Sequence, residues 1–378
     1  MVEWKKLGDI GEVCMCKRIM KEQTSDHGDV PFFKIGTFGA EPDSYISKAL
    51  YDEYKSKYSY PKKGDILLSA SGTIGRTVVF DDKDSYFQDS NIVWIDNNEK
   101  TVLNKYLYYY YQIVNWKTDG GTIKRLYNYN LKNILIAIPP QKEQQRIVEQ
   151  LDTFTSSIEN LKEQIAQRRK QYEYYRDQLL DLEGKEVVEM KTLGEIGEFI
   201  RGNGIQKSDF VEDGYSCIHY GQIHAKYGFS ATETLSKIEK SLYDKCKKAK
   251  KGDVVLATTS EDAEGVAKPF VWLGDEDVAV SGDAFIYHHN QNGKFMGHQF
   301  MTHKFMNFKV KYATGAKVVR ISGDNMAKFE VALPSLYEQQ RIVSILDTFE
   351  ASIQNLEAQL NERQKQYEYY RNKLLTFE

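Results

Sequence analysis

The sequence predicts an α/β (α+β) protein in which two similar globular domains are separated by two long antiparallel coiled-coil helices, with internal pseudo-two-fold symmetry. The main observation is a repeat. Residues 143–180 and 338–375 are identical at 25 of 38 positions when they are aligned with an offset of 195. Because repeats at a fixed offset dictate architecture, two distant copies indicate two related halves rather than a solenoid. The periodicity within each copy and a fainter repeat of the preceding segments support this fold class.

The expected order is a mixed domain at residues 1–138, a long helix at 139–184, a second mixed domain at 185–333 and a second long helix at 334–378. Within the mixed domains LGDIGEV recurs as LGEIGEF, and KKGDILLS recurs as KKGDVVLA. Short β-branched runs predict strands, and the glycine and Asx residues between them predict turns. The aromatic run Tyr106–Trp116 predicts a buried helix.

Both long segments carry the signals of a helix start. Pro139–Pro140 and Pro334 precede them, as expected for prolines at a helix entry. Ser335 followed by Glu338 has the spacing of a capping box. Apolar residues then alternate three and four apart for more than four heptads, which predicts a coiled-coil seam on helices about 60 Å long.

The repeat favours antiparallel pairing of the two helices. If Leu151 meets Leu374, then Leu161 lies near Arg363, and the offset of 195 generates the mirror-image pairing around Arg168. A seam arginine is usually a register device or a partly exposed side chain whose stem covers apolar surface, although direct contact with a partner is an alternative.

Composition excludes several protein classes. Apolar content of 41% and aromatic content of 13% are high for a disordered chain. No apolar run reaches about 18 residues, so no membrane span is expected. The N-terminus MVEWKKLGDI lacks an apolar secretory core, and four cysteines in this length suit a reducing compartment. The expected location is therefore cytoplasmic.

Charge and motifs argue against a catalytic centre. The net charge is −3, with +1 over residues 1–138 and 0 over residues 185–333, so any phosphate contacts must be local or depend on other subunits. The chain has no GxxxxGK[ST] phosphate loop and no glycine-rich dinucleotide fingerprint. Its one Pro-Pro pair, in IPPQ, is not preceded by Asn or Asp and followed by an aromatic residue, as it would be in an adenine methyltransferase. Cys14-x-Cys16 lacks accepted zinc spacing. We expect no catalytic residues, bound metal or cofactor.

The two domains repeat their scaffold but not their loops. The segment SASGTIGR at Ser69–Arg76 corresponds to TTSEDAEG at Thr258–Gly265, and Lys34 and Thr37 correspond to His219 and Gln222. Two domains that share a fold but present different side chains at corresponding loops suit a protein that recognises two different targets.

At this point the whole chain resembles the specificity subunit of Type I restriction–modification systems. The resemblance rests on EQQRIV at Glu143–Val148 and Glu338–Val343, the duplicated helices, and the GDILLS and GDVVLA strands after Lys-Lys. It implies that each domain is a target-recognition domain for one half of a bipartite, asymmetric double-stranded DNA sequence. The helix pair would fix the spacer between the two halves.

The same resemblance implies partners. Two modification subunits, which bind S-adenosylmethionine and methylate adenine, would dock on the helices and the adjoining domain surfaces, and ATP-dependent restriction subunits can join. S-adenosylmethionine, ATP and Mg²⁺ would belong to those subunits alone. The candidate docking residues are the repeated helix starts: Glu143, Gln144, Gln145, Arg146, Glu338, Gln339, Gln340 and Arg341.

We expect the DNA contacts among loop side chains that donate or accept hydrogen bonds, because arginine, lysine, asparagine, glutamine and hydroxyls contact base edges and phosphates. In the first domain they are Lys34, Thr37, Ser69, Ser71, Thr73, Arg76, Gln88, Asn91, Lys124 and Arg125. In the second they are His219, Gln222, His224, Thr258, Thr259, Ser260, Lys268, Lys317 and Arg320.

Several alternatives remain open at this stage. Any one of these residues can be an ordinary solvated loop side chain. Glu261, Asp262 and Glu264 can accept from cytosine or point away from DNA. The basic runs Lys245–Lys251 and Lys55–Lys63 are either solvated helix faces or phosphate contacts. The competing functions are a protein-only scaffold, which the neutral domain charge favours, and a self-sufficient nuclease or methyltransferase, for which the motifs are missing.

Overall fold

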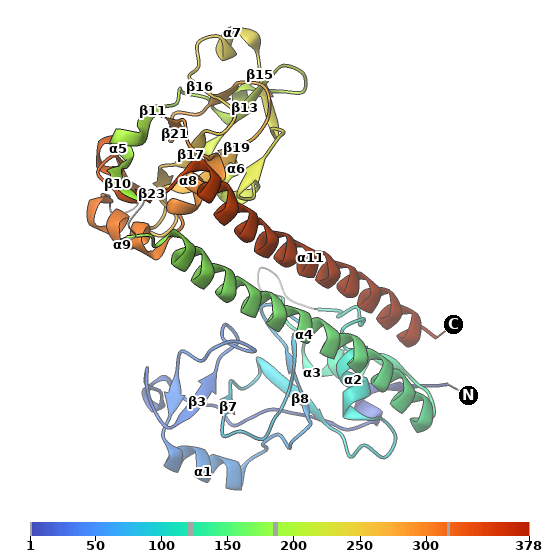
Figure 1. The fold of residues 1–378 in the computed structure, drawn as a ribbon. Coiled ribbons are helices and arrows are strands. Elements are labelled where there is room, and N and C mark those ends of the chain that lie inside the picture. The colour runs from blue at the N-terminus through green and yellow to red at the C-terminus, as the bar shows by residue number, and fades with distance from the viewer. Residues whose placement is uncertain (1, 119–123, 184–187, 316–317, 378) are drawn as a thin grey trace. The chain divides into compact units, whose positions relative to one another are not determined.

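The computed structural model describes residues 2–118, 124–183, 188–315 and 318–377, and the chain divides into two compact units. Unit 1 comprises Met1–Lys162 and Ala358–Glu378, and unit 2 comprises Glu163–Glu357. Helices α4 (Gln141–Leu180) and α11 (Leu336–Leu375) each run without interruption for 40 residues (Figure 1). The expected two mixed domains and two long helices are present, but each unit contains part of both helices in addition to its domain.

Unit 1 is built on two small sheets and a separate antiparallel pair of strands that lie far apart in the sequence. The four-stranded sheet has the order β2 (Glu12–Cys14), β8 (Ile92–Asp96), β5 (Ile66–Ser69), β6 (Thr77–Val79), and the three-stranded sheet has the order β4 (Tyr45–Ile46), β3 (Val30–Phe33), β7 (Tyr86–Phe87). β1 (Glu3–Lys6) pairs antiparallel with β9 (Leu135–Ile138). The helices are α1 (Lys48–Lys57), α2 (Asn104–Tyr110) and α3 (Asn128–Lys132).

Unit 2 repeats this plan with longer sheets. One five-stranded sheet has the order β11 (Gly197–Arg201), β21 (Ala284–His289), β17 (Val254–Ala257), β19 (Lys268–Trp272), β14 (Ser230–Ala231). The other five-stranded sheet has the order β12 (Phe210–Val211), β15 (Ser236–Ile238), β13 (Tyr215–Ile218), β20 (Val278–Val280), β16 (Lys248–Ala249). β10 (Glu189–Thr192) pairs with β23 (Glu330–Leu333), and β18 (Thr259–Ser260) with β22 (Val319–Arg320). The helices are α5 (Leu193–Ile196), α6 (Tyr220–Ala225), α7 (Lys240–Tyr243), α8 (Gly293–Gln299), α9 (His303–Tyr312) and α10 (Gly323–Met326).

The repeated KKGD motif forms the same turn before the central strand of each unit. The Asp65 carboxylate accepts the backbone N–H of Lys62 at 2.8 Å, and the Asp253 carboxylate accepts that of Lys250 at 2.7 Å. Both aspartates are buried, and burial raises the pKa of each carboxyl. The turn therefore starts β5 and β17 in equivalent positions, which explains why these residues repeat while the loops after the strands differ.

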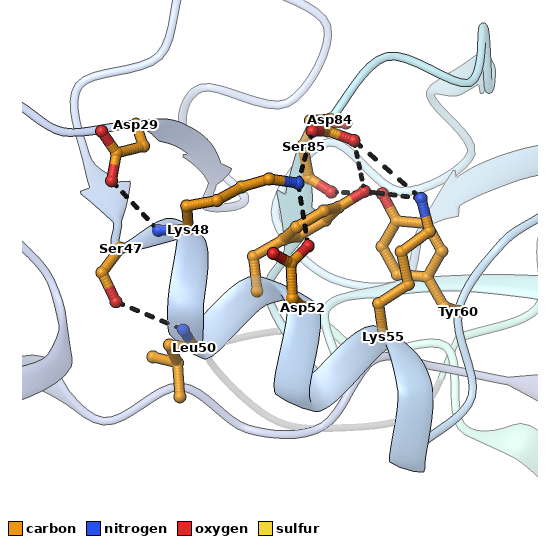
Figure 2. Close-up of polar contacts among 10 residues, drawn as sticks. Asp29, Ser47, Lys48, Leu50, Asp52, Lys55, Tyr60, Asp84 and Ser85 are labelled. Atoms are coloured by element: carbon orange, nitrogen blue, oxygen red, sulfur yellow. Dashed lines mark hydrogen bonds and ion pairs between the residues drawn. The ribbon is translucent and has the colours of Figure 1, made fainter.

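Helix α1 packs against the three-stranded sheet of unit 1. Tyrosine hydroxyls and ion pairs connect the helix to the neighbouring segments. Ser47 caps the helix by accepting the Leu50 N–H at 3.3 Å. The Lys48 ammonium forms ion pairs with Asp52 and Asp84 (Figure 2), and it lies 2.8 Å from each carboxylate. The buried Tyr51 donates its hydroxyl to Asp84.

The lysines of the first basic run are engaged with neighbouring groups. Lys55 donates to the Tyr51 hydroxyl, Lys57 pairs with Glu53 and Lys62 pairs with Asp96. These contacts favour a structural role for the run over phosphate binding. Exposed ion pairs of this kind contribute little stability individually.

Two expected helices differ in the structure. The aromatic run over residues 106–116 is buried up to Tyr111 and mostly half-buried beyond it. Its helix ends at Tyr110, after which the chain turns and Trp116 packs against the Tyr111 ring. The lysine-rich segment 245–251 is not helical. Cys246 and Ala249 are buried and the segment forms edge strand β16 against β20, so apolar burial at this spacing overrides the helical interpretation.

The long helices begin where the prolines predict. α4 begins directly after Pro140, and Ser335 Oγ accepts the Glu338 N–H at 3.3 Å at the start of α11. The first turns are part of the domain cores, since Ile147 and Leu151 in α4 and their counterparts in α11 are fully buried. Each domain is therefore packed rigidly against the start of the helix that follows it.

Within unit 1 the two helices pair antiparallel, and their contacts agree with the expected meeting of Leu151 and Leu374, whereas Arg363, which was expected near Leu161, contacts Phe154. The ring of Phe154 in α4 stacks on Tyr370 of α11 with centroids 5.3 Å apart, and the guanidinium of Arg363 lies 5.8 Å from the Phe154 centroid. Leu151 and Leu374 belong to the same apolar cluster. The half-buried seam arginine therefore lies over an aromatic ring of the facing helix, where a cation–π interaction stabilises the pair.

Unit 2 contains the same contact at an offset of 195. Tyr175 stacks on Phe349 at 5.5 Å, and Arg168 lies 6.0 Å from the Phe349 centroid. Arg169 adds an ion pair to Glu357 at 2.6 Å. The aromatic stack and the arginine at the ring thus repeat at the offset of 195, as the internal repeat predicted, whereas the ion pair does not, since Gln364 and Lys162 stand at the corresponding positions.

A buried polar network joins both helices to α8 in unit 2. The Tyr172 hydroxyl donates to Glu350 at 3.1 Å and lies 3.2 Å from His298 Nδ1. His298 is fully buried, and burial lowers its pKa to about 3, helped by the nearby charges of Arg176 and Lys294. The imidazole is therefore neutral in the folded protein at physiological pH.

Acidification should destabilise unit 2 through His298. The folded-state pKa of about 3 lies below the ordinary value of 6.5, so the unfolded state takes up a proton first as the pH falls through 6.5. Each pH unit below 6.5 should cost up to about 1.4 kcal/mol of unfolding free energy. Urea unfolding at pH 7, 6 and 5 gives the unfolding free energy at each pH. This free energy should change less steeply with pH in His298→Gln than in the wild type. The exposed control His27→Gln should keep the wild-type slope, and equal slopes for all three proteins would contradict the role of His298.

Candidate nucleic-acid interface

In unit 1 the predicted contact residues of four separate segments converge at one end of the central sheet. The Arg76 guanidinium donates to the Phe38 carbonyl at 2.7 Å, which ties the loop after β5 to the turn after β3. The Gln88 side-chain oxygen accepts the Ile35 N–H at 2.9 Å, which ties the same turn to the segment before β8. The turn after β3, the loop after β5 and the segment before β8 are therefore held together by hydrogen bonds.

A second set of hydrogen bonds adds the segment after residue 123 to these three segments. Ser71 donates its hydroxyl to Asn91 Oδ1 at 2.7 Å, and Arg125 donates to the same oxygen at 3.3 Å. The backbones of Ser71 and Arg125 also form a β-bridge. Asn91 is thereby fixed between two loops, while the Arg125 side chain stays exposed.

The unit 1 candidates divide into exposed side chains and internal ones. Thr73, Arg76, Lys124 and Arg125 are exposed. Ser69, however, is buried, and its hydroxyl donates to the Thr73 carbonyl at 2.5 Å and accepts the Arg76 N–H at 2.9 Å.

The expectation that Ser69 contacts DNA is wrong, because its buried hydroxyl forms hydrogen bonds with the backbone of its own loop. Ser71 is buried as well, and its hydroxyl donates to Asn91.

The turn at residues 34–37 is also partly occupied by internal contacts. The Lys34 ammonium lies 3.1 Å from the Asp43 carboxylate, and the Thr37 hydroxyl accepts the Lys34 N–H at 3.2 Å. Both side chains are half-buried, and the Lys34–Asp43 pair is accessible enough to be exchanged for another anion.

Unit 2 places its candidates at the corresponding end of its sheet. Thr259 in β18 pairs with Arg320 in β22, as Ser71 pairs with Arg125 in unit 1. His224 Nε2 lies 2.9 Å from the Thr259 carbonyl, and Lys268 donates to the His224 carbonyl at 3.0 Å. These four residues form one cluster. Burial lowers the pKa of Lys268, whose side chain is half-buried.

Three candidates of unit 2 are internal. His219 is buried, caps α6 by accepting the Gly221 N–H at 3.1 Å, and has its pKa lowered by burial and by Lys207. Gln222 is buried and donates to the Ser236 hydroxyl at 2.7 Å. Thr258 is buried and donates to the Asp283 carbonyl at 3.3 Å.

The expectation that these three side chains face DNA is therefore corrected, because each completes a local structure. Ser260 is half-buried and accepts the Asp262 N–H at 3.5 Å. Lys317 lies outside the described residues.

The structure adds residues that the sequence did not single out. A hollow of about 400 Å³ lies beside the β18–β22 pair, and Arg201, Asp283, Thr314 and Arg320 are among its lining residues. A second hollow of about 400 Å³ shares Arg201 and Asp283 with it. Arg201 ends an apolar strand run, and that position, at the end of a strand, was the only signal in the sequence.

Arg125 and Arg320 are the most informative pair. They are 195 residues apart, and the backbone of each pairs with the loop after the central strand. Arg125 does so through an isolated β-bridge to Ser71, and Arg320 does so as part of β22, opposite Thr259. Both side chains are exposed. The scaffold therefore presents one arginine at the same place in each domain, next to loops whose sequences differ.

The repeated helix starts are partly structural. The Gln144 amide oxygen accepts the Leu103 N–H at 2.9 Å, and its nitrogen donates to the carbonyls of Thr101 and Pro139. Gln339 repeats this by accepting the Asn292 N–H at 3.0 Å and donating to the Pro334 carbonyl. Neither glutamine has exposed surface, so the expectation that they contact a partner is corrected.

The remaining residues of both helix starts are accessible. Glu143 pairs with Arg146, and Glu338 pairs with Arg341 at 2.7 Å. Gln145 and Gln340 are exposed on the same helical turns. These six side chains remain candidates for docking.

Within the described ranges, no group of three or more histidine, cysteine, aspartate or glutamate residues is arranged to bind a metal ion. In the same part of the chain, no helix is both long and apolar enough to cross a membrane.

Comparison with known proteins decides the family. Residues 1–168 and 185–365 both match the model of the Type I restriction modification DNA specificity domain. The chain belongs to this family. The two matches cover both domains with most of both helices, so this specificity subunit carries two such domains.

Individual relatives agree. The Type I restriction enzyme EcoR124I/EcoR124II specificity subunit of Escherichia coli is 29% identical over 389 residues, covering 100% of this chain and 94% of the relative. A Haemophilus influenzae protein named as a type I restriction enzyme specificity subunit is 65% identical over 181 residues, which is 47% of this chain and 47% of that protein. The chain thus spans about half the length of the Haemophilus protein in that alignment.

Two solved structures share the fold. The Type I restriction–modification S subunit from M. genitalium matches with a TM-score of 0.57 and 15% identity over 100% of this chain and 97% of that chain. A chain from a structure describing complex assembly and conformational transition of the type I R-M system matches with a TM-score of 0.61 and 15% identity, covering 99% and 96%. At such low identity these matches establish the fold alone.

Substitution at the helix start should separate the buried glutamine from its exposed neighbour. Gln144→Leu leaves one N–H and two carbonyls without their partner, so the unfolding free energy of unit 1 should fall by about 2–4 kcal/mol. Gln145→Leu, whose side chain is exposed, should change it by less than about 0.5 kcal/mol. Urea unfolding measures both, and similar effects for the two variants would contradict the structural role of Gln144.

Proposed function

We propose that each domain of this specificity subunit recognises one half of a bipartite, asymmetric double-stranded DNA sequence, and that the chain itself performs no chemical step. The observation that carries the proposal is the equivalent placement of Arg125 and Arg320 beside unlike loops. An arginine can bind guanine in the major groove through two hydrogen bonds or can contact a phosphate. Family membership supports the same role.

Exposed and half-buried loop side chains would supply the chemistry that recognition needs. The exposed Thr73, Arg76 and Lys124 accompany Arg125 in unit 1, and the half-buried Thr259 and Lys268 accompany Arg320 in unit 2. Because the two sets differ, the two half-sites should have different sequences. This accounts for the asymmetry of the proposed target.

The neutral charge of both domains points to dependence on partners. Non-specific affinity for DNA comes from neutralising phosphates, and these domains carry net charges of only +1 and 0. Two modification subunits, docked on the exposed residues of the helix starts and adjoining surfaces, would add positive field and bring S-adenosylmethionine. ATP and Mg²⁺ would enter with restriction subunits, and the assembly would work in the cytoplasm.

The direct test is a genome-wide map of methylated adenines in cells with and without this gene. The proposal expects a single two-part sequence motif, with a fixed spacer, that disappears with the gene. The pure chain incubated with labelled S-adenosylmethionine and DNA should transfer no label. Methylation that is unchanged on deletion, or transfer by the isolated chain, would contradict the proposal.

The two arginines should act on separate half-sites. Arg125→Ala should weaken discrimination at the half-site of the first domain, and Arg320→Ala at that of the second, each by about 1–3 kcal/mol for a base contact. Methylation by the assembled complex on targets with single-base changes measures this. If both substitutions weakened all sequences equally, the arginines would be phosphate contacts and not base contacts.

The helix pair should set the spacer length. Inserting four residues after Gln164 and four after Gln359 adds roughly 6 Å to each helix. DNA rises about 3.4 Å per base pair, so the preferred spacer should lengthen by one or two base pairs in a methylation assay. Gln164→Ala combined with Gln359→Ala controls for local disturbance and should keep the original spacer. An unchanged preference after insertion would contradict the ruler role.

A further inference from the structure

A buried lysine lies behind the recognition loop of unit 2. Lys309 in α9 is only 2% exposed, and its ammonium donates to the carbonyls of Glu264 at 2.6 Å and Val266 at 2.7 Å. These carbonyls belong to the returning part of the loop that joins β17 to β19. Burial lowers the pKa of Lys309 to about 8, although Asp262 and Glu264 counteract this.

Burial of a lysine is costly unless its donors are satisfied, so this contact is a specific feature of the loop. At its base the Ala267 N–H donates to the Ala257 carbonyl at 2.8 Å, and within it the Asp262 carboxylate accepts the Gly265 N–H at 2.6 Å. Lys309 ties the returning part of the loop to α9, whereas in the outward part His224 of α6 lies 2.9 Å from the Thr259 carbonyl. The outward part of the same loop carries Thr259, which pairs with Arg320.

Unit 1 has a different contact at the corresponding place. Trp116, which follows α2, packs against Gly75 in the loop after β5, and a Cβ on Gly75 would lie 2.4 Å from the indole nitrogen. Gly75 has φ +89°, a conformation that other residues adopt only under strain. The ring therefore fixes a loop conformation that only glycine permits, as Lys309 fixes the loop of unit 2 by hydrogen bonds.

We propose that Lys309 and Trp116 are positioning residues for sequence recognition: each sets the backbone of the adjacent recognition loop and thereby the base preference of its own domain, without contacting DNA. This inference rests on the proposed function of the loops. Its physical basis is that a base contact depends on orientation, so a loop that samples several conformations loses discrimination before it loses binding. Each residue should affect one half-site only.

The test uses the full chain assembled with its modification subunits on a DNA library that varies each base of both half-sites. Lys309→Met keeps the aliphatic stem and removes the donors, and Lys311→Met on the exposed face of α9 is the matched control. Discrimination at one or more positions of the second half-site should fall at least about five-fold with Lys309→Met, with the first half-site unchanged. The control should match the wild type. Hydrogen exchange over residues 258–266 should be faster in Lys309→Met alone.

A second pair of variants keeps the test decisive if Lys309→Met does not fold. Trp116→Ala should broaden only the first half-site, whereas Trp116→Phe, which retains a ring, should keep most of the discrimination. A variant that lowers methylation of all sequences equally, with its base preference intact, would show that the residue is structural. That result would overturn this inference and leave the proposed function standing. A wild-type complex without a bipartite preference would overturn the proposed function and this inference with it.

Discussion

The structure depends on the burial of the first turns of each long helix in the core of the domain that precedes it. Ile147 and Leu151 are fully buried in unit 1, as are Ile342 and Leu346 in unit 2. Burying side chains of this size contributes about 1.5–3 kcal/mol each. Because the buried glutamine of each helix start also satisfies backbone groups of its domain, domain and helix cannot reorient without exposing apolar surface and breaking hydrogen bonds.

Within each unit, contacts along the seam between α4 and α11 also hold the two helices together. An aromatic stack and an arginine at the ring fix the register of α4 against α11, and the same contact occurs twice at an offset of 195. In the proposed role, register matters because helix length would determine spacer length. Recognition would also need loops with a defined conformation. The contacts of Lys309 and Trp116 with the loop backbones would fix that conformation in the two domains.

The extent of correct prediction follows the range of the interactions involved. The helices, their starts, their antiparallel register and the repeated KKGD turn were predicted because periodicity, prolines and capping residues are local signals. The site was predicted less well. Ser69, His219, Gln222 and Thr258 are polar loop residues like their neighbours, but they are buried, and their partners lie elsewhere in the fold. The lysine-rich segment became an edge strand because burial of Cys246 and Ala249 outweighed its local helical pattern.

The sequence by itself determined the duplicated architecture, the family and the general location of the recognition loops, since these follow from repeats and short-range patterns. Only the tertiary structure decided which loop side chains face outward, and which segments meet at one surface. Asn91 joins Ser71 to Arg125, Arg76 joins its loop to Phe38, and Lys309 supports a loop more than 40 residues away in sequence. Such contacts depend on how the sheets bring distant segments together, and no local periodicity specifies them.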